Sequence, residues 1–301
     1  MKNKILVGAT FRDASQDQID WLDLQLKFLE ATTCDGHGKM LFDHVSYVNW
    51  DGKYAPKERH REGDIEQFDS RNTKVIGLGG ESVVTAASPT SQQHVNSLNA
   101  ILQYFREEKD NYEYFLFLDN DAFPMRRGWV DDLTTKMKEQ GKDIAVAIRS
   151  ENLETRWHAS ILLSDRIGLN SLSFRMELIG LTNLLGEEEY DVTVGGYQHD
   201  LKGRVWPLIR TNQINIHPIA YGIYFDMFYH HTFGGMRHIR KGRNTHAPWD
   251  TLRYGRSSYA TQYIDENYQW RAYNKMLKED PTGFVNKLAG WNPDRYATFD
   301  V

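Results

Sequence analysis

The chain has 301 residues and a formal net charge of −5, and it is 40% hydrophobic, 26% charged and 13% aromatic. This length and composition predict a globular protein with a sizeable core, and the negative charge argues against a general nucleic-acid binder held by a basic face. The single cysteine, Cys34, excludes a disulfide within the chain and a zinc site of several thiolates, and it favours a reducing, cytoplasmic compartment.

The N-terminal residues predict a strand rather than a targeting segment. The apolar run at 5–9 is too short for a signal peptide and has no small-residue cleavage site after it. No other apolar run approaches the roughly 18 residues of a membrane span. We therefore expect no membrane-spanning segment.

The first half alternates apolar runs with helical patterns. Strands are expected at 5–9, 44–49, 74–78, 114–118 and 144–148. Helices are expected around 19–29, after Ser88-Pro89 over 95–105, and around 129–137. This alternation predicts an α/β fold with a mostly parallel central sheet flanked by helices.

The second half is less regular. Residues 180–203 are expected to be helical or loop-like, and 219–229 to form one long aromatic strand. From Arg237 onwards the chain is basic and aromatic, and no element is predicted there. Three interpretations stay open for the basic stretch 237–256: a solvated face, a lid that closes on a diphosphate, or a groove for an anionic acceptor such as DNA or an acidic glycan.

Two carboxylates, Asp119 and Asp121, follow the apolar run at 114–118. Open α/β sheets bind ligands at the carboxyl ends of their strands, and alternate residues point the same way, so both acids could hold one divalent cation. The alternative is an ordinary turn or helix cap. An EF-hand is excluded, because the sixth and twelfth positions counted from Asp119 hold Pro124 and Val130 instead of Gly and Glu.

Three segments together resemble the GT-A fold glycosyltransferases. They are a first strand ending in the short polar loop Ala9-Thr10-Phe11-Arg12, the FLFLDND run ending at Asp121, and a His-rich strand end at 228–237. The resemblance implies a GT-A catalytic domain over 1–240, with a nucleotide-binding half (1–122) and an acceptor-binding half (123–240). Residues 241–301 would then form a C-terminal extension or lid.

The resemblance also implies roles for residues on the donor side. Asp121 would ligate the metal, Asp119 would contact the ribose or the metal, and Asp51 would hydrogen-bond the base. The remaining nucleotide-sugar contacts would be Thr10, Phe11, Arg12, Asn120, Gly234, Gly235 and Arg237. A further metal ligand would be His230 or His231, which point to opposite faces if they lie on a strand. An imidazole ligand favours Mn²⁺ over Mg²⁺.

Three residues are candidates for a catalytic role on the acceptor side. Glu151 and His158 lie in one stretch after the acid pair, and Asp191 in another, and both stretches resemble parts of some bacterial sugar transferases. In an inverting enzyme, Asp191 or Glu151 would deprotonate the acceptor hydroxyl. In a retaining enzyme no such base is required, and the sequence does not decide between the two.

The predicted function is transfer of a sugar from a UDP- or GDP-sugar to a glycan, lipid-linked or other hydroxyl acceptor. A nucleotidyltransferase is an alternative, although the segment after the first strand lacks the glycine-rich loop expected of that class. A non-catalytic carbohydrate-binding protein is another, and it would bind no nucleotide. A two-metal phosphoesterase would need further His and Asp clusters, which the early chain lacks.

Overall fold

The computed structural model describes residues 5–12, 21–35, 37–49, 73–79, 90–148, 157–180, 189–197, 205–208, 210–216, 219–230, 276–281 and 283–284. Its helices are α1 (Trp21–Thr32), α2 (Thr90–Glu107), α3 (Trp129–Glu139) and α4 (Arg166–Ser171). Its strands are β1 (Ile5–Arg12), β2 (Phe42–Asn49), β3 (Thr73–Gly79), β4 (Tyr114–Asp119), β5 (Ala122–Pro124), β6 (Ile144–Ile148), β7 (Trp157–Asp165), β8 (Leu172–Gly180), β9 (Glu189–Tyr197), β10 (Val205–Leu208), β11 (Arg210–Ile216), β12 (Ile219–Tyr224) and β13 (Phe228–His230).

A seven-stranded sheet with the order β10-β6-β7-β4-β1-β2-β3 forms the centre of the molecule. Strand β7 runs antiparallel to β4 and β6, and the other neighbouring pairs are parallel. Strand β4 is apolar up to its last residue because a central strand of such a sheet is covered on both faces. The predicted α/β fold with a mostly parallel central sheet is therefore confirmed.

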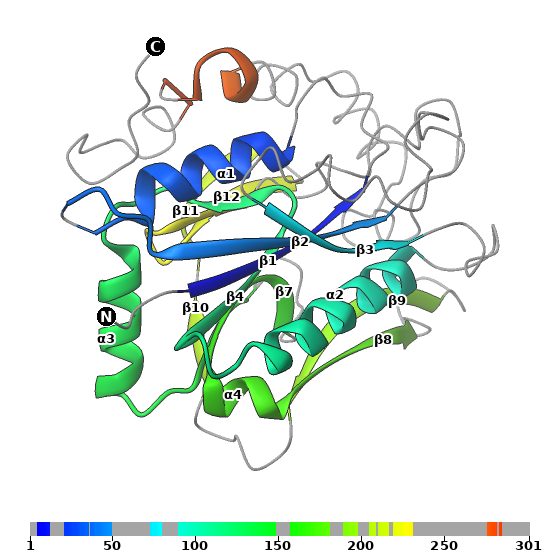
Figure 1. Cartoon of the computed structure of the whole chain (residues 1–301). Coiled ribbons are helices and arrows are strands. Elements are labelled where there is room, and N and C mark those ends of the chain that lie inside the picture. Colours follow the sequence, from blue (N-terminus) through cyan, green and yellow to red (C-terminus); the bar gives the residue numbers. More distant parts are fainter. Residues whose placement is uncertain are drawn as a thin grey trace.

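Helices cover both faces of this sheet, with α1 and α2 on opposite sides (Figure 1). The alternation of side chains along β1 explains the arrangement. Val7 packs in the apolar cluster that contains residues of α1 and α3, whereas Leu6 packs in the cluster that contains α2. A Cβ at Gly8 would lie 2.4 Å from Cγ2 of Ile101, so this glycine allows α2 to lie close against β1.

A second sheet, with the order β11-β12-β13-β5, is antiparallel throughout. Strand β5 follows β4 after a two-residue turn, so the chain passes from one sheet to the other at Asn120-Asp121. The ring of Phe123 on β5 stacks on Phe28 of α1, with ring centroids 4.0 Å apart. This packing ties the second sheet to the helical layer beside it.

Three local predictions were wrong. The segment at 10–12 is not a loop, because β1 continues to Arg12 and pairs with β2 up to Arg12 and with β4 up to Thr10. Residues 189–197 are not helical or loop-like: β9 pairs with β8 along its whole length, and the β-branched run at 192–194 suits a strand. The expected single strand at 219–229 is a hairpin, because Phe225 and Asp226 adopt positive φ values of 51° and 56° and reverse the chain.

The described part of the C-terminal region also contacts the core. Phe284 is fully buried, and its ring meets that of Tyr229 on β13 edge-on at 5.1 Å.

Of the helices that the structure describes, none combines the length and the apolar character of a membrane span.

Candidate metal centre

The turn after β4 brings two carboxylates together with a histidine that lies far away in the sequence. Asp119 is the last residue of β4, and Asp121 lies in the turn that leads to β5. Strand β13 pairs antiparallel with β5, and this register places His230 opposite Ala122. The ladder between these two short strands therefore sets the imidazole beside the acids.

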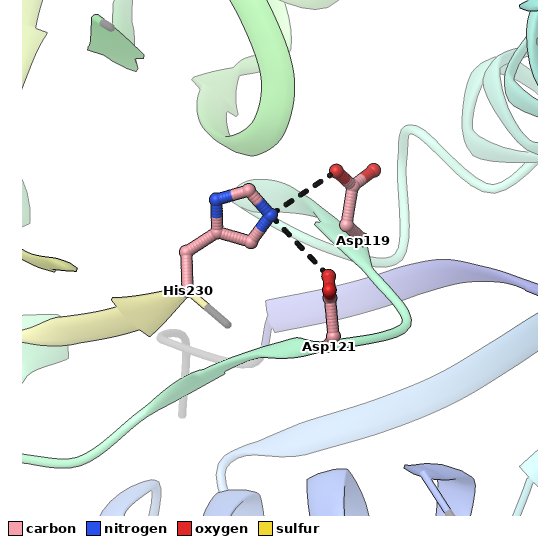
Figure 2. Close-up of side chains that lie close together, drawn as sticks. All are labelled: Asp119, Asp121 and His230. Carbon is pink, nitrogen blue, oxygen red and sulfur yellow. Dashed lines mark ion pairs between the residues drawn. The ribbon is translucent and has the colours of Figure 1, made fainter. Parts of the chain in front are cut away.

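The side chains of Asp119, Asp121 and His230, here called the acidic cluster, point toward one another (Figure 2). Nε2 of His230 lies 3.6 Å from Oδ2 of Asp119 and 3.3 Å from Oδ1 of Asp121. Three candidate ligand atoms, one from each residue, lie within 4.8 Å of one another. This is close to the spacing of ligands that each lie ~2.1 Å from one ion, so a small inward shift would complete a shared site.

The acidic cluster is buried. Asp121 is 3% exposed and His230 is 1% exposed, while the side chain of Asp119 is 15% exposed. Carboxylates at such positions are normally paired with cationic groups or bound to a metal, because an uncompensated charge is costly to bury. Oδ1 of Asp119 is buried and accepts no well-aligned hydrogen bond from the described residues, although Nε2 of His94 lies 3.1 Å away.

The pKa of Asp119 reflects these neighbours. Burial by itself raises the pKa of this carboxyl, but the contacts with His230 and His94 outweigh burial and hold the pKa well below its usual range. Asp119 is therefore ionised at neutral pH, which is the form that binds a metal ion.

The donor set fits a divalent cation. Two carboxylate oxygens and one imidazole nitrogen lie within 4.8 Å of one another, and the buried Oδ1 of Asp119 accepts no well-aligned hydrogen bond from the described residues. Hard oxygen ligands suit Mg²⁺ and Mn²⁺, and the imidazole shifts the preference toward Mn²⁺. The residues of the acidic cluster would supply three ligands and leave further coordination positions for a substrate.

Other predicted donor-side residues lie near this edge of the sheet. Thr10 pairs with Asp119 in the β1–β4 ladder and is buried. Phe11 is also buried, and its ring lies 6.3 Å from that of His44. Asn120 is half-buried in the turn itself. Their roles toward a nucleotide remain predictions.

The remaining predicted site residues fall into two groups. For Arg12, His158 and Asp191 only the backbone is described, on β1, β7 and β9. The others lie outside the described residues: Asp51, Glu151, His231, Gly234, Gly235 and Arg237. Their roles also remain predictions.

Two residues at this edge were not singled out from the sequence, His94 and Gln25. His94 is the fifth residue of α2, which joins β3 to β4, so the N-terminal part of this helix reaches the carboxyl edge of the sheet beside Asp119. Gln25 lies on α1 and donates hydrogen bonds to the turn. The sequence contains one indication of a buried polar role for Gln25, because this residue lies between the apolar residues Leu24 and Leu26.

Comparison by sequence finds no relatives: no protein-family model and no curated protein match this chain. Comparison of the structure finds distant likenesses. A cytidylyltransferase from Leptospira borgpetersenii has 12% sequence identity and a TM-score of 0.31, and the match covers 56% of this chain and 63% of that one.

Two glycosyltransferases show a similarly low degree of structural similarity to this chain. The galactosyltransferase LgtC, solved with donor and acceptor sugar analogs, has 16% identity and a TM-score of 0.32, and the match covers 54% of this chain and 58% of LgtC. A glycosyltransferase involved in glycosylation of the major capsid of PBCV-1 has 9% identity and a TM-score of 0.28, with 55% and 62% covered. The chain thus spans less than two thirds of each of these proteins, and its function has to be argued from its own site.

Proposed function

We propose that this chain is a metal-dependent glycosyltransferase of the GT-A type that uses a nucleotide-diphosphate sugar. The observation that carries the proposal is the acidic cluster, two buried carboxylates and an imidazole at the carboxyl edge of a mostly parallel sheet. Ligands of open α/β sheets bind at this edge. A diphosphate brings the negative oxygens that would complete the coordination of a cation held there.

The chemistry of sugar transfer explains why such a cluster is needed. When the bond between the sugar and the diphosphate breaks, negative charge develops on the departing nucleotide. A divalent cation bound by the acidic cluster would neutralise that charge. The burial of Asp121 and His230 would keep these ligands out of bulk water, which strengthens their electrostatic interaction with the cation.

Residues 1–122 would form the donor half of the site in this proposal. Thr10, Phe11 and Arg12 would line the nucleotide, and Asp51 would accept a hydrogen bond from the base. Thr10 supports this arrangement because it pairs directly with Asp119.

The element after β13 would contact the diphosphate. Gly234 and Gly235 would let backbone N–H groups approach its oxygens, and Arg237 would offset its charge. Residues 241–301 would extend or cover the site.

Residues 123–240 would bind the acceptor. Asp191, or failing that Glu151, would accept the proton of the attacking hydroxyl in an inverting reaction. His158 would lie on the same side and orient the acceptor.

The test is stabilisation by nucleotides. Thermal unfolding is followed with UDP, GDP, CDP and dTDP, each with and without Mn²⁺. At least one should raise the unfolding temperature only when Mn²⁺ is present, because a ligand that binds only the native state stabilises it. If no nucleotide diphosphate does so, the proposal is wrong.

The products then separate the alternatives. A glycosyltransferase incubated with nucleotide sugars releases a nucleoside diphosphate, whereas a nucleotidyltransferase incubated with nucleoside triphosphates releases pyrophosphate. A carbohydrate-binding protein does neither and is stabilised by sugar without nucleotide. A screen of nucleotide sugars for released diphosphate also identifies the base and the donor sugar.

A further inference from the structure

A second set of buried polar side chains contacts the same turn. Gln25 of α1, His44 of β2 and Thr73 of β3, here called the neutral cluster, are each at most 3% exposed. They come from three elements that are separate in the sequence. A polar group in a core stabilises the protein only if it is hydrogen-bonded, so the partners of these side chains indicate what the cluster does.

Gln25 bridges the two ends of the turn that carries the acids. Its Nε2 donates to the backbone oxygen of Asp119 at 2.9 Å and to that of Ala122 at 2.7 Å. These two carbonyls flank Asn120 and Asp121. One amide group thus holds the backbone on both sides of the turn, and the first carbonyl belongs to Asp119 itself.

The neutral cluster has one consistent hydrogen-bond direction. Because Nε2 of Gln25 faces two carbonyl oxygens, its Oε1 must be the atom that faces His44, at 3.1 Å from Nε2 of that ring. Nε2 of His44 therefore carries the hydrogen, and Nδ1 accepts from the hydroxyl of Thr73 at 2.5 Å. Burial lowers the pKa of His44 to about 3, which agrees with a neutral ring.

This direction makes the amide group of Gln25 difficult to replace. His44 fixes the carbonyl end of the side chain, and the opposite end can then only donate, toward the turn. The other side of the same segment is held by β13, which pairs with β5 at His230 and Ala122. The turn is thus held between α1 and β13, and Gln25 supplies the polar contacts from α1.

We propose that Gln25 is a positioning residue for the metal centre, which holds the Asp119–Ala122 turn so that both carboxylates meet His230. The inference rests on the proposed function in so far as it assigns a divalent cation to the acidic cluster. Without the amide, two inward-facing carbonyls would lose their donor and turn toward other partners, carrying the carboxylates with them.

The experiment compares two substitutions on the same helix. Gln25→Met keeps the length of the side chain and removes the amide. Thr32→Val is the matched control, because Thr32 is also buried on α1 and its hydroxyl donates to the backbone oxygen of Phe28 at 2.6 Å, within the same helix and not to the turn. Mn²⁺ affinity is measured from the electron paramagnetic resonance signal of free Mn²⁺, and unfolding by urea gives the stability of each variant.

A second readout needs no metal. Amide hydrogen exchange of the peptide that covers 119–123 reports directly on the turn. We expect Gln25→Met to weaken Mn²⁺ binding about 10-fold or more and to speed exchange in this peptide. Thr32→Val should leave both within about twofold, because its hydroxyl bonds a carbonyl of its own helix.

Each outcome decides the proposal. A folded Gln25→Met protein with unchanged Mn²⁺ affinity and unchanged exchange overturns it, and so does an equal loss in Thr32→Val, because the effect would then be general destabilisation. If the wild-type protein binds no Mn²⁺, the proposed function fails, and the exchange experiment alone decides whether Gln25 holds the turn. If Gln25→Met does not fold, Gln25→Asn keeps the amide but is one methylene shorter, and the same losses are expected.

Discussion

The turn from Asp119 to Ala122 contacts two buried clusters, and each of them contains a histidine. They differ in whether their hydrogen-bond donors and acceptors are matched. In the neutral cluster the amide, the ring and the hydroxyl satisfy one another and two backbone carbonyls. In the acidic cluster two carboxylates share one imidazole, and an oxygen of Asp119 is left without a well-aligned hydrogen bond among the described residues.

This difference separates a structural role from a binding role. A satisfied neutral network stabilises the fold in the absence of any ligand, and removing a member leaves a buried group without its partner. A cluster with excess negative charge is held in place by the surrounding fold and gains stability when a cation arrives. Substitutions in the two clusters should therefore have different consequences for stability and for metal binding.

The largest expected effect is at Asp121. Asp121→Ala should abolish the Mn²⁺-dependent stabilisation by nucleotide diphosphate, which is about 2.7 kcal/mol for a wild-type protein at 100 times its dissociation constant, and should abolish donor hydrolysis. Stability without metal should be retained, because the substitution relieves the repulsion between two neighbouring carboxylates. Thermal unfolding and a hydrolysis assay measure both.

The matched control for Asp121→Ala is Asp23→Ala. Asp23 is a half-exposed acid on α1 that pairs with Lys27 at 3.0 Å, and its loss should change neither readout. Normal metal-dependent stabilisation in Asp121→Ala would show that the acidic cluster is not the metal site.

The next largest effect is the pH dependence that His44 contributes. Its folded pKa is about 3, whereas a histidine in the unfolded chain titrates near its ordinary value of 6.5. Below pH ~6.5 the unfolded chain takes up a proton that the folded ring does not, so stability falls with decreasing pH by up to ~1.4 kcal/mol per unit until pH ~3. Above pH ~6.5 this contribution is constant.

Urea unfolding of the wild type and of His44→Gln at about pH 7 and about pH 4.5 isolates this slope, since the other histidines cancel in the comparison. Asp119 does not interfere, because the effect of its lowered pKa arises mainly below the ordinary value of 3.8 and is the same in both proteins. Stability that falls equally in both proteins over this range would contradict the assignment of a neutral, buried His44.

A smaller loss of stability is expected from Thr73→Val. The substitution keeps the shape of the side chain but leaves Nδ1 of His44 without its donor, which should cost about 2 kcal/mol in the free energy of unfolding. Mn²⁺ affinity should change by less than about threefold, because Thr73 reaches the turn only through two other side chains.

Thr134→Val is the control for this effect. Thr134 is a buried residue of α3 whose hydroxyl donates to the backbone oxygen of Val130 at 2.7 Å. That carbonyl can keep a helical partner, so the cost should stay below about 1 kcal/mol. If Thr73→Val and Thr134→Val lower the free energy of unfolding equally, the hydrogen bond between Thr73 and His44 contributes no more to stability than an ordinary bond within a helix.

The smallest effect is expected at His94. Its Nε2 lies 3.1 Å from Oδ1 of Asp119, and its side chain is 24% exposed, so we treat it as a neighbour that orients this carboxylate. His94→Ala should weaken Mn²⁺ binding about 10-fold, or ~1.4 kcal/mol, without abolishing it. His37→Ala, at an exposed position, serves as the control. A complete loss of binding in His94→Ala would identify His94 as a ligand.

Much of this fold and part of the site could be predicted from local sequence patterns. The strand at 144–148 has the bounds expected from its apolar run, and α3 begins at Trp129, where the helical pattern begins. The acids of the site were found because Asp119 ends an apolar run that only a buried strand explains. Such features depend on neighbours a few residues away, so they can be read without knowing the fold.

The strand β9 shows where local patterns fail. Its segment begins with acidic residues and contains two glycines, which favour loops, yet nine residues of it pair with β8. The pairing satisfies the backbone groups of both strands, and this gain outweighs the local preferences. The segment 219–229 fails in the opposite sense, because its aromatic pattern predicts one strand, whereas Phe225 and Asp226 reverse the chain so that β12 pairs with β13.

By itself, the sequence determined that a mostly parallel sheet ends in two carboxylates suited to a cation. The resemblance offered His230 or His231 as a further metal ligand, but only the tertiary structure brought His230 beside both acids and Gln25 against the turn. The physical reason is that both contacts join segments about one hundred residues apart, through the β5–β13 register and through an amide of α1 that faces two carbonyls of the turn. Register and hydrogen-bond direction between distant segments are set by packing, and no local pattern in either segment carries them.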